Sequence, residues 1–246
     1  MPIGSFDQGA GDRGLSTKLW HGLNPDVIRN DPRRGMFYLD DFLQASDLTA
    51  DAYVNGRQYV EATGRVVLAD DEEFGVEAIG GAAATDNQAQ AVFWPGCVVT
   101  PAAGRTIVME ARVKVDTITT GSDAFVGLGQ ATIDVSHLTA GAIAASMDNV
   151  VGFWSIRDLA LLAGGIKADV SATTAATGFV DGAYTKIGLR INGLKTLQFF
   201  QDGTEITNTI ADTSIPIVAL RPGISNGSDG TDAALLSIDW MAIGAT

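Results

Sequence analysis

The sequence is poor in the two side chains that most often bind transition metals. Its 246 residues include one cysteine and two histidines. Cys97 cannot form an intramolecular disulfide alone, and with His21 and His137 it makes no cluster with the spacing of a zinc or iron site. We therefore expect no metal and no cofactor. We interpret Cys97 as a small buried hydrophobic residue, because free cysteine is among the most buried residue types.

Basic side chains are scarce relative to acidic ones. The chain has 16 Lys and Arg against 29 Asp and Glu, which gives a net charge of −13. A protein that binds nucleic acid needs a basic face to displace counterions from the phosphates. The charge balance therefore argues against nucleic acid as a direct partner.

Long apolar runs are also missing. No stretch reaches the length of about 20 apolar residues that a transmembrane helix needs. The first residues, Met1–Asp7, have neither the basic start nor the apolar core of a secretory signal. We expect no membrane partner, and a protein that stays in the cytosol where it is made or leaves by a route other than secretion.

Residues 1–35 differ chemically from the rest of the chain. They carry a net charge of +1, so the remaining residues carry −14. They contain three of the seven prolines, and their apolar side chains follow neither a helical nor a strand period. Such a segment buries too little surface by itself to offset its ordering entropy. We predict an extended N-terminal arm that is disordered or lies against another surface, with no local core to bury Trp20.

From Met36 onward, short apolar runs alternate with turn residues, which is typical of an all-β protein. In the run Thr106–Val115, alternate residues are apolar, whereas Glu110, Arg112 and Lys114 occupy the opposite face. This alternation predicts an antiparallel strand with one face in the core and the other in water. Further strands are predicted at Ala124–Gly129, Val150–Ile156, Tyr184–Ile191, Thr196–Gln201 and Leu235–Ile243.

Two dipeptides carry the strongest hairpin signals. Asn192–Gly193 and Asp202–Gly203 frame a short apolar run, and both residue pairs favour tight turns between antiparallel strands. We predict a three-stranded meander over Tyr184–Thr209. Strands that recur at intervals of about 8–12 residues with glycine-rich turns favour a sandwich or a barrel.

The meander and the last predicted strand resemble a known fold family. Its motifs are an aromatic strand that ends in Asp-Gly, a proline-bearing segment, and a final strand of the form Ile-Asp-Trp. The residues concerned are Phe199, Phe200, Asp202, Gly203, Pro216, Pro222, Ile238, Asp239 and Trp240. They resemble the closing half of concanavalin-like jelly rolls of the laminin-G, lectin and glucanase-like group. The opening run Met36–Gln44 is similar to the first strand of such modules, which pairs near the last one.

This resemblance implies an all-β fold, a concanavalin-like antiparallel β-sandwich (jelly roll) over residues 36–246 that follows the extended arm 1–35. Some members of the group hydrolyse polysaccharides with the motif Glu-x-Asp-x-x-Glu, which places carboxylates in one cleft. None of the six glutamates here lies in such a motif. We interpret Glu110, two residues from Arg112, as half of a surface ion pair. The acidic run Asp70–Glu73 could hold calcium, but a solvated loop is the favoured interpretation. We expect no catalytic residues, no metal ligands and no enzyme activity.

A binding or structural role remains. A glycine- and proline-rich arm joined to an acidic jelly roll resembles the decoration or cement proteins of tailed phages. The resemblance implies a virion structural protein on the capsid exterior, made in the host cytoplasm. Its partners would be the major capsid protein and neighbouring copies of itself, in a homo-oligomer for which a trimer is common among such proteins. The expected partner-binding residues are Trp20, His21, Arg29, Arg33 and Arg34, through which the arm gains order on binding.

Two alternatives stay open. The arm could instead be a lid packed on its own domain. The chain could also be a carbohydrate-binding, lectin-like module on a fibre or adsorption structure, because tryptophan faces stack on sugar rings. Trp154 and Trp240 lie in apolar strands and are expected in the core, whereas Trp94 precedes Pro95–Gly96 and its environment is left open.

Overall fold

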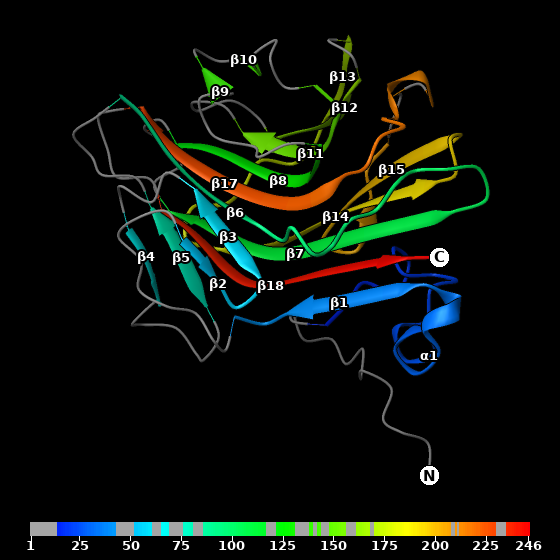
Figure 1. Ribbon diagram of the computed structural model, residues 1–246. Coiled ribbons are helices and arrows are strands. Elements are labelled where there is room, and N and C mark those ends of the chain that lie inside the picture. Colours follow the sequence, from blue (N-terminus) through cyan, green and yellow to red (C-terminus); the bar gives the residue numbers. More distant parts are fainter. Residues whose placement is uncertain are drawn as a thin grey trace.

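The strands form two antiparallel sheets that lie face to face, which confirms the predicted sandwich (Figure 1). The computed structural model describes residues 14–42, 52–60, 65–68, 76–80, 86–116, 122–130, 138–139, 142–143, 148–155, 161–167, 170–207, 210, 212–229 and 235–246. Residues 1–13 and the acidic run Asp70–Glu73 lie outside the described residues.

Within the described residues, each large sheet has eight strands. Sheet A contains, in spatial order, β16 (Thr204–Glu205), β15 (Thr196–Gln201), β14 (Tyr184–Asn192), β7 (Thr106–Asp116), β18 (Leu235–Ala245), β5 (Glu77–Gly80) and β4 (Arg65–Leu68), with β1 (Met36–Asp40) also paired to β18. Sheet B contains β13 (Val170–Ala175), β12 (Leu162–Lys167), β11 (Val150–Ser155), β8 (Ser122–Gly129), β17 (Arg221–Asp229), β6 (Asp86–Phe93), β3 (Arg57–Val60) and β2 (Ala52–Val54). The other elements are the strand pair β9 (Leu138–Thr139) and β10 (Ala142–Ile143), the helix α1 (Pro25–Asn30), and the 3-10 turns η1 (Pro32–Arg34) and η4 (Asp212–Ser214).

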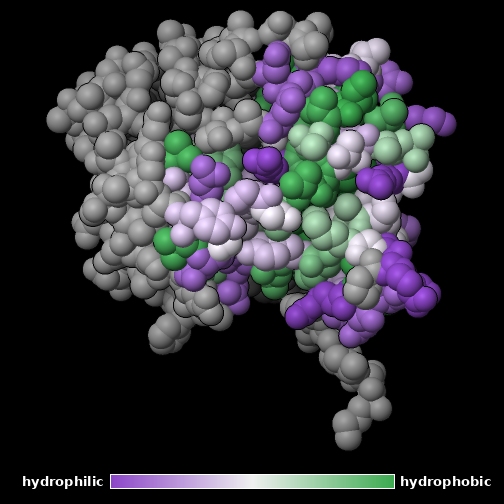
Figure 2. All heavy atoms as spheres, in the orientation of Figure 1, coloured by the Kyte–Doolittle hydropathy of each residue, from purple (hydrophilic) through white to green (hydrophobic). Residues whose placement is uncertain are grey.

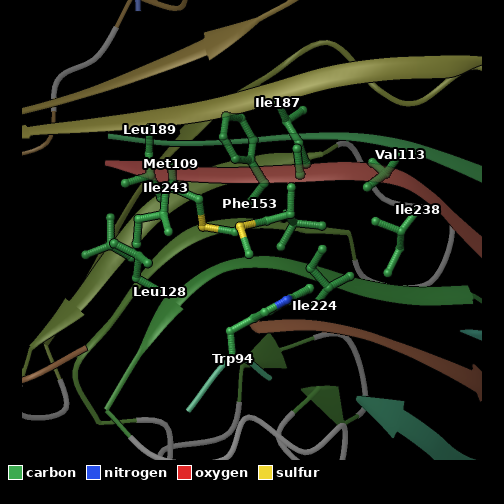
Figure 3. Close-up of a cluster of buried hydrophobic side chains, with 14 of the residues drawn as sticks. Trp94, Met109, Val113, Leu128, Phe153, Ile187, Leu189, Ile224, Ile238 and Ile243 are labelled. Atoms are coloured by element: carbon green, nitrogen blue, oxygen red, sulfur yellow. The ribbon is translucent and has the colours of Figure 1, made fainter. Parts of the chain in front are cut away.

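The core fills the space between the two sheets (Figure 3). The predicted inward face of β7 is confirmed: its five alternate apolar residues, Ile107, Met109, Ala111, Val113 and Val115, are all buried there. Sheet B contributes side chains such as Leu128, Phe153 and Ile224 to the same core, and Figure 3 shows them pointing toward sheet A. Cys97, Trp94 and Trp154 are buried as well.

Two local predictions are confirmed: the turn at Asp202–Gly203 and the pairing of the first strand with the last. Asp202 and Gly203 both have positive φ angles and connect β15 to β16 in a two-residue turn, with Gln201 opposite Thr204. The third strand of the meander is short, because β16 contains only two residues. Met36 lies opposite Ala245, so the first strand pairs with the last, as the resemblance implied.

A buried ion pair connects the two sheets. Arg57 on β3 donates from Nε to Asp40 Oδ2 on β1 at 2.7 Å, and Trp94 Nε1 donates to the same oxygen at 2.7 Å. Burial opposes ionisation of Asp40, but the hydrogen bonds from Arg57 and Trp94 outweigh it and hold the pKa of this carboxyl below its usual value. Trp94 is therefore a core residue that also fixes a charged group.

Candidate partner-binding site

Residues 14–34, called the N-terminal segment below, pack on the outer face of sheet A. This face lies opposite the inter-sheet core, and α1 lies beside β1 (Figure 1). The apolar side chains of the segment and of the sheet form one buried cluster: Leu19, Trp20, Leu23 and Ile28 from the segment, with Val108, Phe200, Trp240 and Ala242 from β7, β15 and β18. Trp20 is only 5% exposed, so the expectation that it has no local core is wrong. For residues 14–34 the arm is a packed lid on its own domain.

Two glycines leave the space that the segment occupies. A Cβ atom at Gly244 on β18 would lie 2.8 Å from Cζ3 of Trp20 and 3.2 Å from Cδ2 of Leu23. A Cβ atom at Gly188 on β14 would collide with Cδ2 of Leu19. Because these contacts are tighter than real Cβ contacts, the absence of a side chain at both positions shapes the sheet surface for this segment.

Glu110 on β7 binds the segment through its carboxylate. It accepts hydrogen bonds from the backbone N–H of Ser16 at 3.0 Å and from Trp20 Nε1 at 2.7 Å, and a third from the hydroxyl of Ser16. Burial raises the pKa of Glu110 above its ordinary value, and the bonds from Ser16 and Trp20 offset only part of this effect.

The predicted surface ion pair between Glu110 and Arg112 is wrong. Glu110 is 1% exposed, because the N-terminal segment covers the face of β7 that the alternation assigned to water. Arg112 pairs instead with Asp239, with Nη1 2.5 Å from Oδ2, and its guanidinium lies 3.9 Å from the ring centre of Tyr184.

Two cations of β14 bind the main chain of the segment. Lys186 Nζ donates to the carbonyl of Gly14 at 3.1 Å. Arg190 Nη1 donates to the carbonyls of Leu19 at 2.8 Å and His21 at 2.6 Å. These bonds fix the position of the segment along the strand. We call the receiving surface, made by Val108, Glu110, Lys186, Gly188, Arg190 and Gly244, the docking groove.

The helix α1 is capped by Asn24, whose side chain accepts from the backbone N–H groups of Asp26 and Val27. Pro25 opens the helix, where its missing N–H has no cost. Asp31 ends it and pairs with Arg33 at 3.0 Å. The helix and the turn after it therefore carry Arg29, Arg33 and Arg34 on a defined backbone, while His21 lies before the helix.

The five predicted partner-binding residues fall into two groups, one buried and one exposed. Trp20 is turned inward, whereas His21, Arg29, Arg33 and Arg34 are exposed, with 90% of the Arg33 side chain and 65% of the Arg34 side chain accessible. Hydrophilic side chains gather over α1 at the lower right of Figure 2. The structure thus divides the set into one internal anchor and four surface residues.

Arg33 and Arg34 line a depression that sequence reasoning did not identify. It has a volume of about 320 Å³, and its other lining residues include Arg105, Val98 and Thr100. None of the side chains that line it, all in the described part of the chain, is acidic. A guanidinium group binds carboxylates through two parallel hydrogen bonds. Arg33 and Arg34 each pair with Asp31, at 3.0 and 3.5 Å, and this carboxylate offsets part of their charge. Arg105 adds a third guanidinium group, and the three together suit an acidic ligand.

Part of this site could have been detected in the sequence. Val108 on β7 interrupts the polar face of its strand with an apolar residue. A strand that is apolar on both faces is covered on both sides. No pattern in the sequence marks Arg105, Lys186 or Arg190, because the residues of the N-terminal segment that they lie beside are more than 60 residues away in the chain.

Other candidate chemistry is limited. Among the described residues, no group of three or more His, Cys, Asp or Glu side chains could hold a metal ion. All four tryptophans, Trp20, Trp94, Trp154 and Trp240, are buried, so none offers an open face for a sugar ring. No helix in the described part of the chain is long and apolar enough to cross a membrane.

No family model matches the sequence, and a search of curated proteins finds no match. Solved structures do match. Peanut lectin, in a complex with a 9-residue peptide, has a TM-score of 0.57 at 12% identity over 86% of this chain and 98% of that one. The carbohydrate recognition domain of Emp47p has a TM-score of 0.54 at 13% identity, over 83% and 93%. An endo-1,3-beta-glucanase from Streptomyces sioyaensis also has a TM-score of 0.54, at 10% identity over 85% and 95%.

These likenesses span most of each chain at low identity, so they establish the fold. The chain is an all-β, concanavalin-like antiparallel sandwich, similar to lectins and glucanases in the arrangement of its strands. An activity does not follow from the fold, because one fold hosts many functions.

Proposed function

We propose that this chain is a non-enzymatic structural protein, a decoration or cement protein on the exterior of a phage shell. Its partners would be the major capsid protein and neighbouring copies of itself. The observation that carries the proposal is the convergence of Arg33, Arg34 and Arg105 on one depression of a protein whose net charge is −13. A cationic surface on an acidic protein selects an acidic protein partner and opposes other orientations.

The role of Trp20 differs from the sequence-based hypothesis. Because its ring is buried and its N–H is bound to Glu110, Trp20 holds the segment on its own domain. Arg29, Arg33 and Arg34 are then presented from a fixed backbone. A preorganised segment binds with a smaller entropy cost than a free arm would.

The environment of Glu110 argues against a catalytic role for this glutamate. It is the glutamate on the strand with the clearest alternation, yet both of its carboxylate oxygens bind the N-terminal segment. A general acid or nucleophile of a glycosidase must reach its substrate together with a second carboxylate. Glu110 lacks this access while the segment is docked.

The proposal is tested by reversing the charge at the depression. We expect the double variant Arg33→Glu/Arg34→Glu to fold as the native chain does and to bind purified phage particles at least tenfold more weakly in a co-sedimentation assay. The matched control is Lys195→Glu/Arg221→Glu, which reverses two exposed cations outside the depression and should bind as the native chain does. Equal binding by all three proteins, or no binding by the native chain, would contradict the proposal.

A second candidate is a carbohydrate-binding, lectin-like module. The fold-level likeness to peanut lectin and to the Emp47p carbohydrate recognition domain favours it, while the burial of all four tryptophans weakens it. Binding of the full chain to a glycan array separates the two functions. Saturable binding to one sugar class would favour the lectin-like role, and a structural protein should show none.

A further inference from the structure

We propose that the docking groove is a peptide-binding site that accepts residues 14–31 from a second copy of the chain as well as from its own. Two copies would then be linked by exchange of this segment. This exchange rests on the part of the proposed function that gives the chain neighbouring copies of itself as partners. It can be measured on the purified protein alone, so it can fail while attachment to a shell holds.

The first support is that the segment and the inter-sheet core are separate. The large buried cluster between the sheets includes no member from residues 14–34, and the cluster on the outer face has its own members. Removing the segment from its groove therefore leaves the interior packing unchanged. A unit that opens locally needs less free energy than global unfolding.

The second support is the kind of contact that holds the segment. Glu110 accepts hydrogen bonds from the hydroxyl and the backbone N–H of Ser16 and from the indole N–H of Trp20. Lys186 and Arg190 donate hydrogen bonds to backbone carbonyls of the segment. Gly188 and Gly244 accommodate Leu19 and Trp20. Each contact is between side chains and a peptide, so the same set can form with a segment from another copy.

The third support is the connection between the segment and the sandwich. Gly35 alone joins η1 to β1, at a φ of +150° that favours glycine. A Cβ atom here would collide with the carbonyl oxygen of Ala245. Glycine also has other backbone conformations available, which would direct the segment away from its own groove. Exchange of an identical element between copies is a low-cost route to dimers.

The test uses a disulfide across the groove. An ideal Cβ atom at Gly203 lies 3.7 Å from Cβ of Ser16, which is the spacing of a disulfide. In a Cys97→Ala background, the double variant Ser16→Cys/Gly203→Cys should close within one chain and migrate as a monomer on a non-reducing gel. This result establishes that the segment docks on its own domain and that Cys is tolerated at Gly203.

Exchange is then measured by mixing two single variants. Equimolar Ser16→Cys and Gly203→Cys chains, concentrated and oxidised together, should give a disulfide-linked heterodimer at least tenfold above the mixture of Ser16→Cys with Lys195→Cys. Lys195 is exposed at the far end of β15 from Gly203, so exchange does not bring it near Ser16. Closure in the double variant without heterodimer in the mixture would overturn the proposal.

A second measurement follows the assembly state of the native chain. Light scattering after size-exclusion chromatography should show a dimer fraction that rises with concentration. In the Cys97→Ala background, the Ser16→Cys/Gly203→Cys variant, oxidised while dilute so that its segment is locked on its own domain, should lose this fraction and regain it on reduction. A native chain that remains monomeric at the highest concentration, or a dimer that persists in the oxidised variant, would contradict exchange through the groove.

Discussion

The inter-sheet core and the docking groove each bury a carboxylate, and the two carboxylates are stabilised differently. Asp40 in the core faces Arg57 and has a lowered pKa. Glu110 in the groove is held by the donors of Ser16 and Trp20, and its pKa is raised. The core therefore neutralises its charge within the sandwich, whereas the hydrogen bonds of the groove carboxylate come from one particular segment.

The two regions also differ in what they recognise. The core needs apolar side chains at alternate positions and accepts many sequences with that pattern. The groove needs an indole N–H, a serine at a fixed distance from it, and side chains that fit over two glycines. Loss of a core contact should therefore unfold the protein, and loss of a groove contact should release the segment while the sandwich stays folded.

The largest effect is expected in the core. Phe153 is 1% exposed and lies edge-to-face with Phe199 at 5.3 Å between ring centres. Phe153→Ala should cost about 3–5 kcal/mol of the free energy of unfolding, because it leaves a cavity between the sheets. Urea denaturation should show one cooperative transition at lower denaturant. A variant that loses only the segment would contradict the separation of the two regions.

The next effect is expected at Glu110. Glu110→Ala leaves Trp20 Nε1 and the Ser16 N–H without their acceptor, and an unsatisfied buried group costs about 1–3 kcal/mol. The segment should become sensitive to protease while the denaturation midpoint of the sandwich changes little. Glu205→Ala, at an exposed glutamate, serves as the control and should leave the segment protected.

Docking should also depend on pH through Glu110. Its pKa is raised by burial from an ordinary value of 4.5, so the docked state binds the proton more tightly than the released state. Docking should be strongest below pH 4.5 and weaken as the pH rises through the raised pKa. The free energy of segment opening, from hydrogen exchange corrected for intrinsic rates, should be smaller at pH 8 than at pH 4. Glu110→Gln should remove this difference.

Gly244→Ala tests the shape of the groove. The three atoms nearest to the added Cβ belong to Leu23 and the rigid Trp20 ring, and such overpacking typically costs about 1–3 kcal/mol. We expect a partly released segment on an intact sandwich. Gly96→Ala is the matched control, because a Cβ atom there meets nothing within 4 Å. Equal protection of the segment in the two variants would show that the fit over Gly244 is unimportant.

The smallest effect is expected at the cap of α1. Asn24→Ala removes the acceptor for the N–H groups of Asp26 and Val27 and should cost about 1 kcal/mol of helix stability. Faster hydrogen exchange confined to residues 25–30 is the expected result. Unchanged exchange there would mean that packing of Ile28, and not the cap, holds the helix.

The sequence predicts those parts of the fold that depend on local patterns. Alternation in Thr106–Val115 and the turn at Asp202–Gly203 each determine structure within about ten residues. The turn and the inward face of the strand are confirmed, whereas the opposite face, predicted to be in water, is largely buried. The burial and hydrogen bonding of Glu110 depend on Ser16 and Trp20, about 90 residues earlier in the chain, and no local pattern contains that pairing. The candidate site was therefore predicted only in part: the exposed arginines were named, and the groove that positions them was not.

Trp20 lies buried in the docking groove of its own domain, with its indole N–H bound to Glu110. Hydrogen exchange at the Trp20 indole N–H tests it most directly, with the resonance assigned by comparison with Trp20→Phe. Bound to Glu110 and buried, this proton should exchange slowly in the native chain and rapidly in Glu110→Ala. Exchange in the native chain at the rate of an exposed indole would contradict the account.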